Sequence, residues 1–359
     1  MIKPASSLCG MKCDYCFYYD VAASRQFSSM GIMSCETAGQ IIKNVFCVLV
    51  PGDRVTFMFQ GGEPGLAGLD FFEFFVAEVK KSTSPAIVVN YALQTNGLMI
   101  DNNWCNFLRK NNFLVGLSLD GYAALHNLNR RDSFGKGTFN RVMDVKKNLD
   151  THKVMYNILC VLTSESARRA KRIWNFIIKE KISHIQFIPC LEPLESSSSN
   201  DSALTGNRFY NFYSDIYPLW KQEALKRNVI SVRLFEDLSL LFLSGHPVTC
   251  GVTGKCSPQI IVEADGGVYP CDFYVLDQYR VSDLTKHNLR EAIESVINSS
   301  FIKEQQQLPI DCMNCSHNRW CRGGCKRMAK AVYGENCGMK RFADMYLNDL
   351  LTVYKALLR

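Results

Sequence analysis

Three cysteines near the start of the chain, Cys9, Cys13 and Cys16, follow the spacing C-x3-C-x2-C. Thiolates bind zinc and iron–sulfur clusters, and a closed zinc site or a cubane cluster takes four protein ligands. Because three thiolates are one short of that number, a cluster held here keeps an open coordination position. An open position predicts reactive chemistry. A structural zinc site with a distant fourth ligand is the alternative that the spacing leaves open.

A second candidate feature is the string Gly61-Gly62-Glu63-Pro64, which follows a β-rich run. Glycine lets the backbone approach a ligand closely, and a carboxylate beside exposed backbone carbonyls can hold an ammonium group. Alone, such a string is more often a plain turn. Its position after a strand and downstream of three cysteines favours a binding site.

The last third of the chain carries eight more cysteines, spaced C-x5-C-x14-C and then C-x2-C-x5-C-x3-C-x11-C. Eight thiolates equal two complete four-ligand sites, and a C-x2-C pair aims both sulfurs inward. Two structural zinc sites are the alternative. The eight are Cys250, Cys256, Cys271, Cys312, Cys315, Cys321, Cys325 and Cys337. The other five lie in apolar stretches and are predicted to be small core side chains: Cys35, Cys47, Cys105, Cys160 and Cys190.

The composition is that of an ordinary globular protein of 359 residues, 47% hydrophobic and 21% charged. No run of 18 apolar residues and no apolar leader occurs, so we expect a cytoplasmic protein without a membrane partner. Thiolate ligands also suit a reducing compartment. The formal net charge of +7 counts every cysteine as neutral. Clusters at all three predicted sites would lower it to about +2, so the charge gives no reason to expect nucleic acid as a partner.

The stretch from about residue 50 to 230 alternates short β-rich runs with amphipathic stretches, which is typical of βα units around a parallel sheet. The strand candidates are Arg54–Gln60, Ile87–Gln94, Leu114–Leu119, Met155–Leu162 and His184–Pro189. The helix candidates are residues 36–48, 70–81, 102–111, 138–150, 166–180 and 207–227. Polar or glycine-bearing turns follow several strands, where βα barrels bind ligands. The polar stretch Leu194–Thr205 is predicted to be a surface loop.

Helical periodicity weakens after about residue 235, where the eight later cysteines begin. We therefore predict two domains, residues 1–234 and residues 235–359.

The first cysteine motif is followed at once by Phe17-Tyr18-Tyr19 and resembles the signature of the radical S-adenosylmethionine (SAM) superfamily. The Gly-Gly-Glu-Pro string resembles that family's motif for the SAM amino group. The later cysteines resemble the SPASM domain, an auxiliary-cluster extension of radical SAM enzymes that modify peptides. Longer strings are similar to the anaerobic sulfatase-maturating enzymes: Ile2-Lys3-Pro4-Ala5-Ser6-Ser7, Phe59-Gln60-Gly61-Gly62-Glu63-Pro64-Gly65-Leu66-Ala67-Gly68, Leu93-Gln94-Thr95-Asn96-Gly97, His126-Asn127-Leu128-Asn129-Arg130 and Val268-Tyr269-Pro270-Cys271-Asp272-Phe273-Tyr274-Val275-Leu276-Asp277.

The resemblance implies an α/β fold, in which a partial (β/α)6 TIM-like barrel precedes a cysteine-rich iron–sulfur (SPASM) domain with a C-terminal helix. Two departures stand out. Only Met1 to Ser7 precede the first cysteine, where the barrel should have a strand, and Gly65 stands where a threonine or a similar residue is expected.

The resemblance also implies SAM and three 4Fe–4S clusters as cofactors. The SAM-binding cluster would be held by Cys9, Cys13 and Cys16, the first auxiliary cluster by Cys250, Cys256, Cys271 and Cys325, and the second by Cys312, Cys315, Cys321 and Cys337. The residues near SAM would be Phe17, Tyr18, Gly61, Gly62, Glu63, Ser118, Arg130 and Leu191.

The implied activity is oxidation of a Cys or Ser side chain in a sulfatase to formylglycine. Reductive cleavage of SAM would give a 5′-deoxyadenosyl radical, which would remove a hydrogen atom from the substrate Cβ. Asp272 directly follows a predicted cluster ligand and is our candidate base for the thiol proton. Tyr18 and Gln60 are candidates for orienting the substrate peptide. A solvated turn aspartate is the plain alternative for Asp272.

The expected partners are an unfolded sulfatase polypeptide or another peptide substrate and a flavodoxin- or ferredoxin-type electron donor, and we expect a monomer. A second hypothesis is a maturase of the same group that crosslinks a ribosomally made peptide. A multi-cluster electron carrier or a zinc-built binding module would belong to a different class, but an electron carrier needs neither the Gly-Gly-Glu-Pro string nor an open cluster.

Overall fold

The computed structural model describes residues 1–194, 201–247, 249–304, 307–334 and 336–357. Of the predicted loop, residues 195–200 lie outside this part. The fold is α/β, as predicted, and its main sheet has six strands in the order β2-β3-β4-β6-β7-β8. Neighbouring strands pair in parallel. None of the helices in the described ranges is both long and apolar enough to cross a lipid bilayer.

The chain forms two compact units, each assembled from separate stretches of sequence. The first comprises Met1–Ser118, Arg130–Tyr156 and Pro258–Glu304, and the second comprises Leu119–Asn129, Asn157–Ser257 and Gln305–Arg359. The predicted domain boundary after residue 234 stays a prediction.

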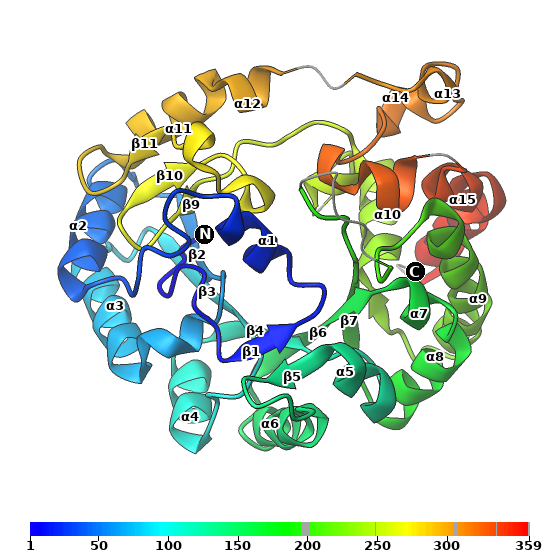
Figure 1. The fold of residues 1–359 in the computed structure, drawn as a ribbon, viewed down its shortest axis with the longest axis horizontal. Helices are drawn as coiled ribbons and strands as arrows, with labels where there is room; N and C mark the ends of the chain where they lie inside the picture. The colour runs from blue at the N-terminus through cyan, green and yellow to red at the C-terminus, as the bar shows by residue number, and fades with distance from the viewer. Residues whose placement is uncertain (195–200, 248, 305–306, 335, 358–359) are drawn as a thin grey trace. The chain divides into compact units, whose positions relative to one another are not determined.

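In the first unit, helices pack on three parallel strands (Figure 1). The strands are β2 (Arg54–Phe59), β3 (Val88–Thr95) and β4 (Phe113–Ser118), and the main helices are α2 (Cys35–Phe46), α3 (Leu69–Ser82), α4 (Asn102–Lys110) and α6 (Phe139–Thr151). Two helices begin at residues whose side chains accept an orphan amide hydrogen, Ser34 for α2 and Asp101 for α4. Their apolar faces, and rings such as Phe59 and Phe72 at 4.8 Å, form the core beneath the sheet.

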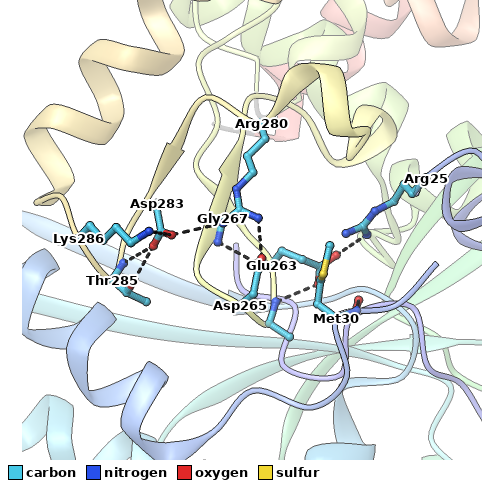
Figure 2. Close-up of polar contacts among 11 residues, drawn as sticks. Arg25, Met30, Glu263, Asp265, Gly267, Arg280, Asp283, Thr285 and Lys286 are labelled. Atoms are coloured by element: carbon cyan, nitrogen blue, oxygen red, sulfur yellow. Dashed lines mark hydrogen bonds and ion pairs between the residues drawn. The ribbon is translucent and has the colours of Figure 1, made fainter. Parts of the chain in front are cut away.

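A small antiparallel sheet completes the first unit. Its strands are β9 (Ile261–Val262), β10 (Gly267–Tyr269) and β11 (Ser282–Asp283), and it is followed by α11 (Leu289–Asn298). Figure 2 shows the polar contacts that brace it. Arg280 lies between two carboxylates, those of Asp265 and Asp283. A buried ion pair of 2.6 Å between Arg25 and Glu263 ties the segment after the cysteine loop to the turn that follows β9.

The second unit contains the remaining strands and the long helices. It holds β6 (Met155–Leu162) from residue 157 onward, β7 (His184–Pro189) and β8 (Ser231–Val232), with α5 (Ala123–Asn129), α7 (Ser164–Ala167), α8 (Ala170–Lys179), α9 (Gly206–Leu225), α10 (Arg233–Ser244) and α15 (Gly338–Leu357). α15 packs along α9 (Figure 1). Asp349 of α15 joins this contact because it accepts from the Tyr217 hydroxyl and pairs with Lys221, both at 2.7 Å.

The five predicted strands are all present, with ends that differ by a residue or so. The helix predicted over residues 166–180 is wrong in one respect, because it is divided into α7 and α8. The sequence also missed β8, whose two residues are too few to show a period. At the N-terminus, Ile2 forms single-residue bridges to Phe59 and Val262. The strand expected before the cysteines is therefore reduced to one bridging residue.

Candidate active site

The first cysteine loop is held by two short elements of the first unit. β1 (Met11–Cys13) pairs antiparallel with β5 (Arg130–Asp132), and α1 (Phe17–Ala23) begins directly after Cys16. The three thiols thus lie on a loop whose two sides are both anchored. A loop anchored in this way can direct several thiolates toward one bound metal cluster.

The Cys9 sulfur accepts hydrogen bonds from the Met11 amide at 3.4 Å and from the Asn96 side chain at 3.6 Å. Such donors favour the charged thiolate, which is the form that binds iron. In the part of the chain that the structure describes, no three His, Cys, Asp or Glu side chains converge as they would around a single metal ion. A cubane cluster binds each thiolate through a different iron, so its ligands stand farther apart. The donor set fits an iron–sulfur cluster.

The glycine turn after β2 is in backbone contact with the segment that leads into Cys9. Gly62 has φ of +50°, and a Cβ at this position would overlap the Leu8 carbonyl oxygen. The Glu63 amide donates to the same carbonyl at 2.7 Å. Gly62 is therefore required both for its backbone conformation and for the close approach of the cluster loop.

The Glu63 carboxylate is buried and joins the ends of two strands. It accepts hydrogen bonds from the Thr95 hydroxyl and the Asn96 amide at 2.7 Å and from the Gly65 amide at 3.0 Å. Burial raises the pKa of Glu63, and the three donors oppose that rise. We predicted this carboxylate to hold the SAM ammonium group. The structure places it in contact with donors of its own chain, and the predicted contact stays a prediction.

The three candidate catalytic residues form one partly buried group of side chains in the first unit. The Tyr18 hydroxyl donates to Asp272 Oδ2 at 2.7 Å, and the Gln60 amide donates to the Tyr18 oxygen at 2.6 Å and to Asp272 Oδ2 at 3.0 Å. Asp272 is 7% exposed, so it is not the solvated turn residue of the plain alternative. Burial and then the adjacent carboxylate raise the pKa of Tyr18 well above its usual value, so the phenol keeps its proton and acts as a donor.

Lys3 also contacts this group of side chains, and the sequence analysis did not identify it. Its Nζ lies 2.7 Å from Asp272 Oδ1, with both side chains nearly excluded from solvent, and 4.2 Å from the centre of the Tyr18 ring. Gly61 makes room for it, because a Cβ there would lie 2.7 Å from Lys3 Nζ. A signal was present, since a charged residue in a segment expected to be a barrel strand must find an internal partner.

The two oxygens of Asp272 differ in what they contact. Oδ2 accepts from Tyr18 and Gln60. Within the described residues, Oδ1 is buried and pairs with Lys3 but accepts no hydrogen bond of good geometry. The two oxygens therefore differ in kind, one accepting two hydrogen bonds and the other taking part in an ion pair.

Phe17 and Ser118 were both predicted to lie near SAM. The centre of the Phe17 ring lies 4.0 Å from that of Tyr18 and 4.9 Å from that of Phe273. Phe273 directly follows Asp272 in sequence. Ser118, at the end of β4, accepts a hydrogen bond from Gln94 at 3.2 Å. The ends of adjacent parallel strands bring these polar side chains to one edge of the sheet.

Arg130 and Leu191 were also predicted to lie near SAM. Arg130 is 7% exposed, so it is not a solvated surface residue. Its guanidinium lies 5.5 Å from the centre of the ring of Tyr15, a residue between Cys13 and Cys16 in sequence. Leu191 follows β7 in the second unit and is buried.

Four of the later cysteines form one group in the second unit. They are Cys312 in α13 (Ile310–Met313), Cys321 at the end of α14 (Asn318–Cys321), Cys315 between these helices, and Cys337 just before α15. Burial, and then the neighbouring thiols of the other three, raise the pKa of Cys321 to about 12. Four thiols that influence one another in this way fit the predicted second auxiliary site.

A second group in the same unit joins cysteines that are far apart in sequence. Burial and the nearby thiols of Cys250 and Cys256 raise the pKa of Cys325 to about 11. The Cys325 amide donates to the Gly251 carbonyl at 3.0 Å. This grouping has the crossed order that the SPASM resemblance implied. Its predicted fourth member, Cys271, immediately precedes the 3-10 helix η3 (Asp272–Tyr274) in the first unit.

The remaining five cysteines divide into two kinds. Cys105, Cys160 and Cys190 are buried, as predicted. The same prediction is wrong for Cys35 and Cys47, which are exposed. They occupy the first residue and the C-cap of α2, and the ends of a surface helix face solvent more than its middle does.

Comparison with known proteins agrees with this geometry. The Radical SAM superfamily matches residues 4–172, and the SPASM iron–sulfur cluster-binding domain matches residues 254–323. The two matches lie on opposite sides of the predicted boundary at residue 234. The chain therefore carries a radical SAM domain, whose chemistry needs SAM and a 4Fe–4S cluster, and a domain for auxiliary clusters.

The similarity to individual proteins extends over nearly the whole chain. A cysteine-type anaerobic sulfatase-maturating enzyme of Clostridium perfringens is 39% identical over 99% of this chain and 94% of its own length. A serine-type anaerobic sulfatase-maturating enzyme of Klebsiella aerogenes is 27% identical over 94% of this chain and 82% of its own length. The solved structure of native anSMEcpe with bound AdoMet and Cp18Cys peptide matches with a TM-score of 0.91 and 36% identity, over 99% of this chain and 98% of that chain. This chain belongs to the anaerobic sulfatase-maturating enzymes of the radical SAM superfamily.

Proposed function

We propose that this enzyme converts a cysteine side chain in a sulfatase peptide to formylglycine. The higher identity to a cysteine-type relative, 39% against 27% for a serine-type relative, favours cysteine as the residue modified. The observation that carries the proposal is the group of side chains around Asp272, where a buried carboxylate pairs with Lys3 through Oδ1, an oxygen that accepts no hydrogen bond within the described residues.

We assign each residue around Asp272 a role in this reaction. When bound, SAM and its cluster would supply the radical chemistry that removes a hydrogen atom from the substrate Cβ, and the auxiliary clusters would accept one further electron. Asp272 Oδ1 takes the thiol proton, so that the substrate leaves as a thioaldehyde, which water converts to the aldehyde with release of hydrogen sulfide. Tyr18 and Gln60 hold the other oxygen of Asp272 in place, and Lys3 balances its charge.

The ligand assignments belong to the same proposal. Cys9, Cys13 and Cys16 would hold the SAM-binding cluster, and the glycine turn and the strand ends beside them would surround SAM. The two groups of thiols in the second unit, together with Cys271, would hold the auxiliary clusters that receive the electron.

The remaining partners are proposed on chemical grounds. A reductant of low potential must reach the SAM-binding cluster, and a flavodoxin- or ferredoxin-type protein supplies such electrons. The substrate would be an unfolded sulfatase polypeptide, since a side chain must enter a buried pocket. Thiolate-held clusters suit a reducing compartment, so we propose a cytoplasmic enzyme that works as a monomer.

The test is direct. Reconstituted enzyme is incubated without oxygen with SAM, a reductant and a short Cys-x-Pro-x-Arg peptide, and the product is examined by mass spectrometry. We expect an aldehyde at the cysteine position, trapped by a hydrazide reagent. A ring-closed peptide without an aldehyde would instead support the crosslinking hypothesis, and SAM cleavage without any peptide product would contradict this choice of substrate.

A further inference from the structure

Tyr333 is a buried side chain of the second unit that the proposed chemistry does not use. It ends the π-helix η6 (Ala329–Tyr333) and is 5% exposed. π-helical turns are rare and are frequently found at functional sites, because the inserted residue redirects a side chain. The contacts of the Tyr333 side chain therefore bear on its role.

The hydroxyl of Tyr333 reaches the first group of later cysteines. It donates to the Gly251 carbonyl at 2.9 Å, and the Cys325 amide donates to the same carbonyl at 3.0 Å. Gly251 directly follows Cys250 in sequence. One carbonyl therefore links the tyrosine to the backbones of two predicted ligands of the first auxiliary cluster.

The ring of Tyr333 packs on the short link between the two groups. Gly324 has φ of +63°, and a Cβ at this residue would overlap the Tyr333 ring. The Gly324 amide donates to the Cys321 carbonyl at 2.8 Å. Gly324 lies between Cys321, a predicted ligand of the second cluster, and Cys325, a predicted ligand of the first. The ring thus rests on the backbone that joins one site to the other.

We infer that Tyr333 is a positioning residue that sets the spacing between the two auxiliary cluster sites. The inference rests on the proposed function, in which an electron passes through these clusters. The rate of electron transfer falls steeply with the gap between centres, so a rigid ring at the junction keeps that gap constant. The hydroxyl anchors one side of the junction and the ring supports the other.

The experiment uses the full-length chain with Cys9, Cys13 and Cys16 changed to Ala, so that only the auxiliary clusters remain. After anaerobic reconstitution and reduction, paramagnetic resonance measures the magnetic interaction between the two reduced clusters, which depends on their separation and orientation. We compare Tyr333→Phe, which removes only the hydroxyl, with Tyr333→Leu, which also removes the ring. The matched control is Tyr217→Phe, which removes a hydroxyl from another buried tyrosine of the same unit that bonds to Asp349.

We expect Tyr333→Phe to keep the iron of the parent protein but to lose part of the splitting between the clusters, and Tyr217→Phe to leave it unchanged. Tyr333→Leu should lose more of the splitting. If Tyr333→Leu loses iron instead, the Phe variant decides the question. Unchanged splitting in Tyr333→Phe, or an equal change in Tyr217→Phe, would overturn the inference.

In the enzyme with all clusters, Tyr333→Phe should also form more 5′-deoxyadenosine per modified peptide. This second readout separates the two proposals. If the wild-type chain makes no formylglycine, the proposed function fails, whereas the magnetic result for Tyr333 still stands or falls by itself.

Discussion

The first unit contains two buried carboxylates near the cluster loop that contrast in their surroundings. Glu63 is held by three uncharged donors that use both of its oxygens. Asp272 faces a lysine on one oxygen and two uncharged donors on the other, and the oxygen beside the lysine accepts no hydrogen bond within the described residues.

We infer from this difference that Glu63 has a structural role and Asp272 a chemical one. A buried carboxylate that accepts several hydrogen bonds from its own chain stabilises the groups that donate to it. A carboxylate with charge compensation and a vacant acceptor position can take a proton from a substrate. We therefore expect Glu63 to matter for the shape of the site and Asp272 for its reaction, and five changes test that division.

The largest effect is expected from Gly62→Val, which should abolish activity. The resemblance of this string to the SAM amino-group motif implies that a side chain here would disturb SAM, but in the structure it would first overlap the Leu8 carbonyl beside Cys9. We therefore expect loss of the first cluster, seen as about one third of the iron of a protein with about twelve iron atoms. The matched control is Gly10→Ala in the same loop, where a Cβ meets nothing within 4 Å. Full iron with loss of SAM binding alone would contradict this interpretation.

Asp272→Asn should lower formylglycine formation by about 10²- to 10⁴-fold, or about 3 to 5 kcal/mol of barrier. The amide keeps the size of the side chain but cannot take the thiol proton. SAM should still be cleaved, so 5′-deoxyadenosine and modified peptide are measured in one reaction. Asp265→Asn, in the Arg280 network of the same unit, is the control. Loss of both products would show that Asp272 supports the fold, and retention of both would show that another group takes the proton.

Lys3→Met should destabilise the first unit by about 3 to 5 kcal/mol, because it leaves a buried carboxylate without its cation. Lys3→Arg keeps the charge and should recover part of this loss. Thermal unfolding of the reconstituted proteins measures the effect. Equal unfolding temperatures for Lys3→Met and the wild type would mean that solvent reaches Asp272, and the contrast with Glu63 would then disappear.

Glu63→Gln should cost about 1 to 3 kcal/mol of stability, because one of its two terminal positions becomes a donor that faces other donors. With SAM bound, turnover should fall far less than in Asp272→Asn. Unfolding temperature and SAM affinity are measured together. A protein of normal stability that no longer binds SAM would show that the Glu63 carboxylate serves the cofactor, as the sequence motif suggested.

The smallest effect is expected at Asp349, a half-buried carboxylate that sets the lower reference. The hydrogen bond from Lys221 is the main reason that the pKa of Asp349 is lowered. A carboxyl group whose pKa is lowered by folding stabilises the folded protein at any pH above its usual pKa of about 4. That stabilisation is lost as the pH falls through the lowered pKa. Asp349→Asn should cost at most about 1 kcal/mol at neutral pH and nothing in acid. A loss that persists at low pH would point to packing instead of charge.

The sequence was sufficient for features whose spacing is local. The C-x3-C-x2-C motif, the glycine turn and the C-x2-C pair each predict a function within a few residues. The β-rich runs predicted five strands, and the amphipathic stretches predicted most of the long helices. Periodicity failed where elements are short. β8 has two residues, and the N-terminal strand is reduced to a bridge at Ile2. One predicted helix is divided into α7, which begins at a capping box formed by Thr163 and Ser166, and α8, which begins at Ala170.

By itself, the sequence indicated the family and predicted the ligand types and the candidate base, because thiolate counts and short motifs are properties of neighbouring residues. The tertiary structure alone decided that Lys3 pairs with Asp272, that Glu63 accepts hydrogen bonds from Thr95 and Asn96, and that Tyr333 lies at the junction of two cysteine groups. Each of these contacts joins residues that are distant in sequence or directed by an irregular turn. Burial, charge pairing and the direction of a side chain arise only when such segments pack together, and no spacing along the chain encodes them.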